Sequence, residues 1–501
     1  MNNTLRIEKI FVFLIFSLGI AISLAQFLYN RSLWLDEAKL ALNIINKNNI
    51  QLLFPLDYNQ VAPILFLQVE KFFSLLLPNS EYGLRLFPLI AFWVSSYLFY
   101  KILNLIFKSS NIRIVGLSLF FFNATLVYYS SEVKQYMGDI LVLLGLYYVL
   151  LKSYKNDKSK LYLLGILGVV SVFLSNVAPI ILACIGLYLL ISEIKIPKEK
   201  LKSIFLLFFV WGISYVIYYA IFIYNHPSKD FMIRFWTEEN AFMPINPLGR
   251  DFYLFINNTV LNGFYYFFSF GTLLSIFFIF IYCVGIYFLF NSKERRLIIL
   301  TSLPAILHLT LSSFKLYPYH SRLILYNIPL IIIVFLFGLE FIKNTLIIKL
   351  TTVHVNNFFF LIPLFLICNI LFFSNGLNDG FPIQRDQIKP CLKFIDENIK
   401  ATDHIYVYYF SKNPFRYYVD INYFKAKNPR TIASWSNRGH IDKAFDDLKQ
   451  LKGKNWLLFS HWFDNEETKM IHYLDSLGYP KLNSFKTYGS RAYYYDFGGK
   501  E

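Results

Sequence analysis

Long apolar runs, many of them bounded by short clusters of Lys and Arg, recur along the first three quarters of this chain. The first run, Phe11–Leu28, is long enough to cross a bilayer as a helix, and no small-residue cleavage site follows it. Of the 501 residues, 56% are hydrophobic and only 16% are charged, whereas soluble domains carry about 25% charged residues. The sequence therefore predicts a polytopic α-helical membrane protein.

Hydropathy over a window of about 19 residues predicts ten spans after the first, eleven in all. They fall at 84–107, 114–130, 133–151, 161–176, 178–193, 203–224, 262–290, 297–313, 323–342 and 353–374. Basic clusters alternate with less basic loops, so we expect a multi-pass protein of the plasma (inner) membrane with its N-terminus in the cytoplasm and its C-terminal region outside. If the run 61–77 were counted as a further span, every later loop would change sides and the basic clusters would lie outside. Because that run contains Glu70 and Lys71, we expect a helix in the outer interface.

The composition changes at about residue 376, where charges become frequent between short strand-like and helical segments. An apolar stripe from Ile388 to Ile395 predicts a helix. Further helices are predicted at 441–451 and 466–477, and strands at 405–410, 456–460 and 491–497. The expected organisation is a transmembrane domain at 1–375, with an outer loop at 29–83 that carries interfacial helices, and a soluble extracytoplasmic α/β domain at 376–501.

The basic balance does not indicate nucleic acid. The formal net charge is +16, but in a membrane protein basic residues gather in cytoplasmic loops, so the expected surroundings are membrane lipids and no nucleic-acid partner. Three of the four Cys lie in apolar runs, which leaves no disulfide framework. No His, Cys and Asp cluster has metal-ligand spacing, so no obligatory metal or other cofactor is expected.

Four clusters of ionisable residues are candidate functional sites, because a charge inside the membrane costs about 2.5–3.5 kcal/mol on insertion scales. The first cluster, Arg31–Lys39, directly follows the first span. It places Asp36 and Glu37 in the first turn of a short amphipathic helix on the membrane surface, with Lys39 close behind. The alternative explanation is that both carboxylates only complement the helix dipole.

The second cluster, Leu56–Pro63, precedes the interfacial helix and contains Asp57 and Gln60. Its alternative explanation is an ordinary turn with a proline near a helix start.

The third cluster, Tyr128–Asp139, enters the fourth span. At 100° per residue, Glu132, Tyr136 and Asp139 share one face of that span, so this face should line a cavity or a packed interior. An ion pair made by Lys134 is the structural alternative.

The fourth cluster runs from Lys315 through His320 to Arg322 at the outer start of the tenth span. Cations beside tyrosines form an anion site, and Arg binds phosphate oxygens in bidentate geometry. Snorkelling of the basic side chains into an aromatic belt is the alternative. By the parity of the spans, all four clusters lie on the outer side. Carboxylates for base chemistry together with cations for a phosphate suggest sugar transfer from a lipid phosphate.

The Trp34–Ala38 stretch resembles the Asp-Glu motif in the first outer loop of the C-type (GT-C) glycosyltransferases. This family includes the protein O-mannosyltransferases and the aminoarabinose and galacturonosyl lipid A transferases. Matching stretches follow in the family's order, so the resemblance covers about residues 8–345. They are Ala62-Pro63, Arg85–Pro88, Tyr129–Tyr136 and Tyr317–Arg322.

The resemblance implies an enzyme of GT-C fold that transfers a sugar, with inversion, from a polyprenyl phosphate to a hydroxyl of a lipid, glycan or protein acceptor. The family's catalytic Asp falls on Asp36, the adjacent Glu37 is implied as a second catalytic residue, and the donor phosphate would be bound by Lys315, His320 and Arg322. The remaining motif positions imply substrate-binding residues, which are Lys39, Asp57, Gln60, Arg85, Glu132, Lys134, Tyr136 and Asp139.

Two departures from the family pattern concern the substrate. Lys39 stands where several relatives have Arg, and Ala62-Pro63 replaces a doubled proline. Two other classes of protein remain open. A lipid-linked glycan flippase or transporter would also bury charges in a bundle, although no paired broken helices in two halves are evident. A polysaccharide polymerase or ligase is the second alternative.

Overall fold

The computed structural model describes residues 2–153, 158–192, 198–261, 267, 272–346, 352–372, 380–426, 430–433 and 441–498. The chain forms two compact units. Unit 1 comprises Met1–Leu28, Asn49–Glu70 and Arg85–Ile383, and unit 2 comprises Tyr29–Asn48, Lys71–Leu84 and Gln384–Glu501. The loop that carries Asp36 therefore belongs to the same compact unit as the C-terminal residues. The predicted division at 375/376 stays a prediction.

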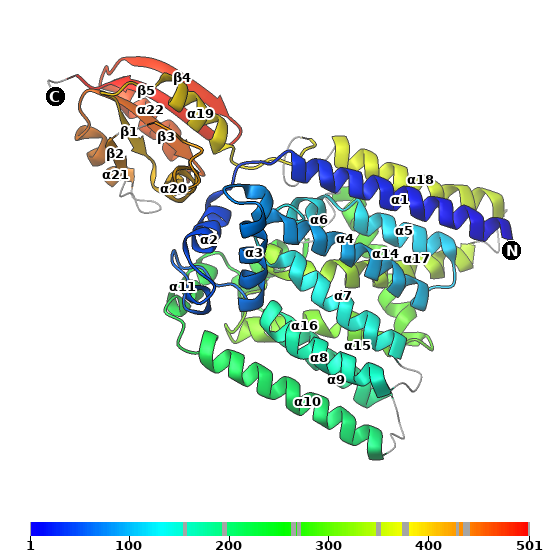
Figure 1. Cartoon of the computed structure of the whole chain (residues 1–501). Helices are drawn as coiled ribbons and strands as arrows, with labels where there is room; N and C mark the ends of the chain where they lie inside the picture. Colours follow the sequence, from blue (N-terminus) through cyan, green and yellow to red (C-terminus); the bar gives the residue numbers. More distant parts are fainter. Residues whose placement is uncertain are drawn as a thin grey trace. The chain divides into compact units, whose positions relative to one another are not determined.

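Unit 1 is built from helices (Figure 1). They are α1 (Asn2–Leu28), α3 (Ile64–Leu76), α4 (Glu81–Ile106), α5 (Ser110–Phe121), α6 (Ala124–Tyr129), α7 (Tyr136–Ser153), α8 (Lys158–Leu174), α9 (Ala178–Ser192), α10 (Lys198–Tyr218), α11 (Lys229–Glu238), α12 (Arg250–Ile256), α14 (Thr272–Asn291), α15 (Leu297–Thr301), α16 (Leu303–Ser313), α17 (Ile328–Leu346) and α18 (Thr352–Phe372). Short 3₁₀ and π segments join them, namely η1 (Gln51–Leu53), η2 (Tyr219–Ile223), η3 (Asn257–Leu261) and η4 (Ser321–Asn327). The last residues of α3 and the first residues of α4 belong to unit 2.

Among the described residues, five helices are long and apolar enough to cross a membrane. They are Glu8–Leu28, Glu81–Ile106, Leu201–Ile223, Leu273–Asn291 and Ser321–Thr345, and shorter apolar helices accompany them. The apolar window of the last one is 83% buried inside the protein, against 28% for those in α10 and α14. Helix α17 therefore lies at the centre of the bundle, and the polytopic α-helical fold class is confirmed.

Helices α14 and α17 approach each other unusually closely. A Cβ on Gly285 would lie 2.0 Å from the Val334 carbonyl oxygen, and one on Gly338 would lie 2.1 Å from the Ile281 carbonyl oxygen. Small residues allow helix backbones to approach in this way within a membrane. Phe278 and Phe335 stack beside this contact, with ring centroids 4.0 Å apart.

Several predicted spans are broken in the structure. The span at 114–130 divides because α5 ends at Phe121, and Asn123 caps α6 by accepting a hydrogen bond from the Leu126 amide at 3.0 Å. The span at 297–313 divides between α15 and α16. Helix α7 begins at Tyr136, so the prediction that Glu132 shares its face was wrong: Glu132 lies in the turn before the helix. In the predicted span 262–290, residues 262–266 and 268–271 lie outside the described residues.

Unit 2 contains a mixed five-stranded sheet in the order β2-β1-β3-β5-β4. Strand β1 pairs in parallel with β2 and with β3, whereas β5 runs antiparallel to β3 and to β4. The strands are β1 (His404–Val407), β2 (Arg430–Ala433), β3 (Lys454–Ser460), β4 (Lys481–Thr487) and β5 (Ser490–Asp496). The helices are α2 (Leu35–Asn46), α19 (Ile388–Asn398), α20 (Lys412–Asp420), α21 (Ile441–Lys449) and α22 (Glu466–Ser476), with a 3₁₀ turn η5 (Tyr409–Ser411).

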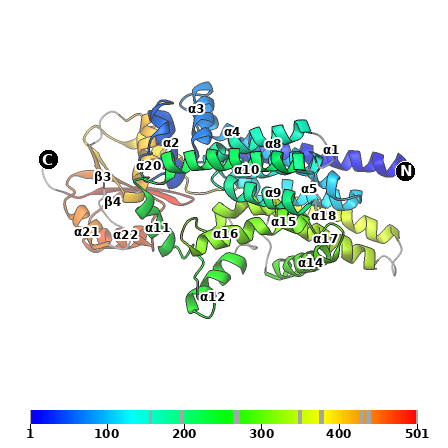
Figure 2. The same ribbon diagram turned by 90° about the horizontal axis from the view of Figure 1, so that it is seen from below.

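Successive side chains of a strand point to opposite faces of the sheet, so the sheet has two faces to bury. Helices pack on both of them. On one face, Tyr406, Leu457 and Tyr495 pack under α21 and α22, which Figure 2 shows together on one side of the strands. On the other face, Phe394 of α19 contacts the ring of Trp456. The predicted C-terminal α/β domain is thereby confirmed, including the buried stripe of α19.

Candidate functional site

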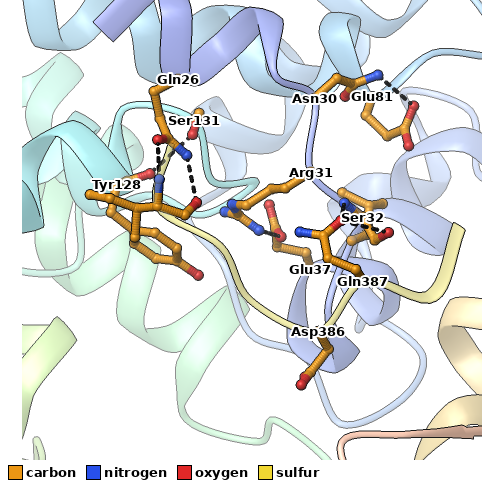
Figure 3. A network of polar contacts seen from close by, with 12 residues as sticks. Gln26, Asn30, Arg31, Ser32, Glu37, Glu81, Tyr128, Ser131, Asp386 and Gln387 are labelled. Atoms are coloured by element: carbon orange, nitrogen blue, oxygen red, sulfur yellow. Dashed lines mark hydrogen bonds and ion pairs between the residues drawn. The ribbon is translucent and has the colours of Figure 1, made fainter. Parts of the chain in front are cut away.

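The first turn of α2, in unit 2, holds two adjacent carboxylates in different environments. Glu37 is fully buried, and its Oε2 accepts a hydrogen bond from Arg31 Nη1 at 2.5 Å (Figure 3). Asp36 is only half-buried, as is Lys39 one turn later. Because a buried carboxylate needs its cation, Arg31 fixes Glu37 in place. Asp36 is the carboxylate of this turn that keeps an accessible surface.

Hydrogen bonds from the C-terminal residues hold the loop that leads into α2. The Leu33 amide donates to the Tyr418 hydroxyl at 2.8 Å. The Ser32 amide donates to Gln387 Oε1 at 3.1 Å, and Figure 3 shows Ser32 beside Gln387. The Lys389 amide donates to Ser32 Oγ at 3.0 Å. Buried backbone groups must find partners, and here residues far along the chain supply them.

A buried acid extends this network to the start of α4. Glu81 Oε1 accepts a hydrogen bond from the Tyr418 hydroxyl at 3.0 Å and forms an ion pair with Lys389 Nζ at 2.8 Å. At the other end of α2, Lys71 Nζ donates to the Ile44 carbonyl oxygen at 2.7 Å. A cation at the last carbonyls stabilises a helix C-terminus. Both ends of α2 are therefore fixed within unit 2.

In unit 1, the structure brings together residues of the second and third clusters. Lys134 Nζ donates a hydrogen bond to Gln60 Oε1 at 2.9 Å, and both side chains are buried. Lys134 lies in the turn between α6 and α7 with Glu132, which is also buried. The two motifs predicted separately from the sequence therefore share one buried polar contact.

The third and fourth clusters also meet in unit 1. Asp139, in the first turn of α7, accepts a hydrogen bond from Ser175 Oγ at 2.6 Å. Burial raises the pKa of Tyr317, and electrostatic interaction with Asp139 acts in the same direction. The Tyr136 ring packs edge-on against Tyr129, with centroids 5.3 Å apart. Tyr317 therefore lies within electrostatic range of the α7 residues that the sequence singled out.

Trp236 of α11 joins two of the predicted phosphate-binding residues. The His320 ring lies 5.5 Å from the Trp236 ring, and the Arg322 guanidinium lies 5.6 Å from the same ring. Burial lowers the pKa of His320, the Arg322 charge lowers it further, and Glu239 acts in the opposite direction. His320 is accordingly neutral at pH 7, so it is a hydrogen-bonding group there, whereas the sequence had suggested a cation.

The loop that carries these residues is fastened to buried groups. His308 of α16 is fully buried; its Nε2 lies 3.0 Å from the Pro318 carbonyl oxygen and its Nδ1 lies 2.9 Å from the Tyr326 hydroxyl. The Tyr319 amide donates to the Ala241 carbonyl oxygen at 2.8 Å. The backbone before His320 is thus tied by hydrogen bonds to His308 and Ala241.

The other predicted residues occupy different positions. Lys315 is exposed and has a left-handed backbone (φ 57°), and the Trp236 contacts involve His320 and Arg322. Asp57 is exposed in the turn before α3. Arg85 is almost completely buried in α4. The structure leaves the roles of all these residues as predictions.

Sequence reasoning missed several contact residues. Arg31 and Trp34 lie inside the first cluster, but nothing in their spacing distinguished them as partners. Trp236 and Ser175 lie in stretches without any motif, so no signal pointed to them. Within the part of the chain that the structure describes, no group of three His, Cys, Asp or Glu side chains is placed to hold a metal ion.

No protein-family model matches the chain, and no curated protein matches its sequence. Among solved structures, the chain is similar to the crystal structure of ArnT from Cupriavidus metallidurans bound to undecaprenyl phosphate. The TM-score is 0.54 at 11% identity, covering 96% of this chain and 97% of that chain. The apo state of the same ArnT gives a TM-score of 0.50 at 10% identity, covering 95% and 97%. This likeness shows that the chain has the GT-C fold of a multi-pass membrane protein.

Proposed function

We propose that this GT-C chain is an inverting glycosyltransferase that moves a sugar from a polyprenyl phosphate to an acceptor hydroxyl at the outer face of the plasma membrane. The observation that carries the proposal is the pair of carboxylates in the first turn of α2. Arg31 fixes Glu37 there and leaves Asp36 half-buried and accessible. The fold likeness to an ArnT structure with bound undecaprenyl phosphate supports the class of donor.

In the proposed reaction, the acceptor oxygen attacks the anomeric carbon of the donor sugar. Asp36 takes the hydroxyl proton as general base while the new C–O bond forms. The bond between the anomeric carbon and the phosphate oxygen breaks on the opposite side, and the lipid phosphate leaves with the electron pair. The sugar is therefore transferred with inversion, and no oxidant or reductant is required.

The leaving phosphate gains charge in the transition state, so fixed donors and cations accelerate its departure. We assign this role to Arg322, with His320 as a neutral hydrogen-bonding partner, since both pack on Trp236. Lys315 is proposed as a further cation at the same loop. Arg322 acts best here because its planar guanidinium matches two phosphate oxygens.

The remaining motif residues are proposed to bind substrate. In unit 1, the hydrogen bond from Lys134 to Gln60 holds one buried cation in a defined position, and Asp139 is similarly fixed by Ser175. The others assigned to substrate are Lys39, Asp57, Arg85, Glu132 and Tyr136. The acceptor is a lipid, glycan or protein hydroxyl. The proposed topology has a cytoplasmic N-terminus and an extracytoplasmic domain at 376–501.

The proposal is tested with the purified full chain in lipid nanodiscs. The donors are synthetic undecaprenyl phosphates that carry aminoarabinose, galacturonic acid or mannose, and the acceptors are envelope lipids and proteins from the source cells. Mass spectrometry should detect free undecaprenyl phosphate together with a glycosylated acceptor. Asp36→Asn should lower the rate about 10²–10⁴-fold, whereas Asp464→Asn, an exposed carboxylate of unit 2, should not. Donor that crosses vesicle bilayers without release of the phosphate would identify a flippase instead.

A further inference from the structure

Trp34, two residues before Asp36, is held by side chains that come from the C-terminal part of unit 2. The residue is only 3% exposed. The Arg385 guanidinium carbon lies 3.3 Å from the centre of the indole, and the His461 ring lies 5.6 Å from it at an angle of 51°. A guanidinium over a Trp face and a tilted second ring are both favourable contacts for this side chain.

His461 is itself fixed at the end of β3. Its Nδ1 lies 2.9 Å from Asp386 Oδ2, and the Phe410 ring meets it edge-on with centroids 6.0 Å apart. The backbone of His461 is left-handed, with a φ of 56°. Asp386 in turn lies so close to Gly489 that a Cβ at that position would be 2.3 Å from Asp386 Oδ1. Residues from three separate stretches of the chain thus hold the imidazole.

The contacts of Trp34 also bear on the start of α2, which has no side-chain cap at its N-terminus. Trp34 is the N-cap residue, and its side chain makes no capping hydrogen bond. Helices usually begin at Ser, Thr, Asp or Asn, whose side chains bind the free amides of the first turn. Here the Trp34 carbonyl oxygen accepts the first helical hydrogen bond, from the Ala38 amide at 2.9 Å. The position of the indole therefore acts together with the Arg31–Glu37 pair and the Leu33 hydrogen bond to Tyr418 in setting where the first turn of α2 lies.

We infer that the Asp386–His461 pair and Arg385 are positioning residues that act through Trp34 to hold Asp36 in the orientation that transfer requires. This inference rests on the proposed function of Asp36 as the base. It follows that residues of the C-terminal α/β domain are required for a normal rate of sugar transfer. Misplacing a reacting group by about 1 Å costs about 10²-fold in rate, so a modest loosening of Trp34 should be measurable.

The test uses the full chain in nanodiscs with His461→Ala, and His472→Ala as the matched control. His472 is exposed on α22 of the same unit. The first readout is hydrogen exchange of the Ala38 amide, which donates the first helical hydrogen bond to the Trp34 carbonyl oxygen, and it does not depend on activity. His461→Ala should accelerate this exchange about tenfold, because opening of the first turn becomes easier. His472→Ala should leave it unchanged. Unchanged exchange in His461→Ala would overturn the inference.

The second readout is a double-mutant cycle on the rate of transfer from the synthetic donor that gives turnover. His461→Ala and Trp34→Phe should each lower kcat, the former by about ten- to a hundredfold. The donor KM should stay within about twofold, because the phosphate-binding groups are untouched. The two effects should be non-additive, whereas Trp34→Phe and His472→Ala should combine additively. Additive effects of His461→Ala and Trp34→Phe would contradict the inference.

The two proposals fail in different ways. If Asp36→Asn retains full transfer, the proposed base is wrong, whatever the exchange data show. If Asp36→Asn is inactive but His461→Ala has the kcat and the exchange of the unmodified chain, the base stands and the positioning role is refuted. Asp386→Asn provides an independent check, since it keeps the size of the side chain and should reproduce the exchange increase of His461→Ala in weaker form.

Discussion

The polar groups of unit 2 and those of unit 1 are held by different means. In unit 2, the first turn of α2 is fixed by a buried ion pair and by partners from the C-terminal residues, such as Tyr418 and Gln387. In unit 1, the polar groups lie where helices break: Lys134 lies between α6 and α7, Ser175 follows α8, and His320 precedes η4. Irregular backbone at membrane depth is tolerated only inside protein or along a cavity.

We therefore expect substitutions in unit 2 to lower mainly the free energy of unfolding, and substitutions in unit 1 to weaken mainly the binding of substrate. Removal of a group from the ion pair of unit 2 leaves a buried charge, and folding should suffer first. Gln60, at the broken helix ends of unit 1, is a neutral hydrogen-bond acceptor of Lys134, so its removal should cost less folding stability than removal of a full counter-charge. Four predictions test this contrast.

The largest expected effect is on the stability of Glu37→Gln. This change removes from the buried Arg31 the carboxylate charge of Glu37 and should cost about 3–5 kcal/mol in the free energy of unfolding. Asp36→Asn, at the neighbouring half-buried position, should lose at most about 0.3–1 kcal/mol of helix-dipole stabilisation. Denaturant unfolding of both variants in detergent measures the difference. Equal stability of the two variants would show that Arg31 does not depend on Glu37.

Gln60→Leu should have a smaller effect on stability, about 1.5–3 kcal/mol, because it removes the acceptor of a hydrogen bond from a charged group. Lys134 would keep its position in the turn before α7 but lose this partner. The same unfolding measurement serves, with the exposed Gln450→Leu as control. A loss as large as that of Glu37→Gln would erase the distinction between the two units.

Arg322→Ala should act on the donor more than on the fold. Loss of a charge-assisted contact of about 1.5–3 kcal/mol corresponds to a rise in donor KM of about ten- to a hundredfold. Arg322→Lys should recover only part of this, because the planar fork is lost. Kinetics with the undecaprenyl-phosphate donor measure the change, and Arg295→Ala, in the exposed turn before α15, is the control. Unchanged donor kinetics in Arg322→Ala would remove Arg322 from the site.

The smallest effect is expected for His320. Its pKa in the folded chain is lowered by burial and by Arg322, so the neutral ring contributes stability that is fully present above the ordinary pKa of about 6.5. That contribution is lost as the pH falls below this value. His320→Gln should therefore keep near-normal transfer and stability at pH 7–8 and should lessen the loss of stability on acidification. The free energy of unfolding of both proteins, measured over a pH series, tests this prediction. A large loss of stability in His320→Gln at pH 8 would contradict a neutral His320.

The broad architecture could be predicted because long apolar runs and period-2 or 3.6 patterns report burial directly. The breaks inside the spans were missed because a 19-residue window averages over them, although Asn123 and Pro304 are local signals of new helix starts. Strand β4 was missed because it is an edge strand with exposed residues, so it lacks a clear apolar alternation. Its lysines suit an unprotected edge.

The candidate site was predictable only as separate motifs. The sequence identified Asp36, Glu37 and Arg322 by type and order, but a single chain carries no signal for which distant side chains meet. The contacts of Arg31 with Glu37 and of Trp236 with Arg322 depend on the tertiary fold. The contact of His461 with Trp34 joins residues far apart in the sequence, and no local pattern around either residue predicts it.

The central claim is that Asp36 is the base of a lipid-linked sugar transfer. The most direct measurement is mass spectrometry of envelope glycolipids and glycoproteins from cells that carry the intact gene, a deletion, or the Asp36→Asn allele at equal protein level. If Asp36 is the base, one acceptor class carries a sugar-sized mass addition only with the intact gene, and the undecaprenyl-phosphate sugar accumulates in the other two strains. A sugar addition that persists at its normal level in Asp36→Asn cells would show that Asp36 is not the base.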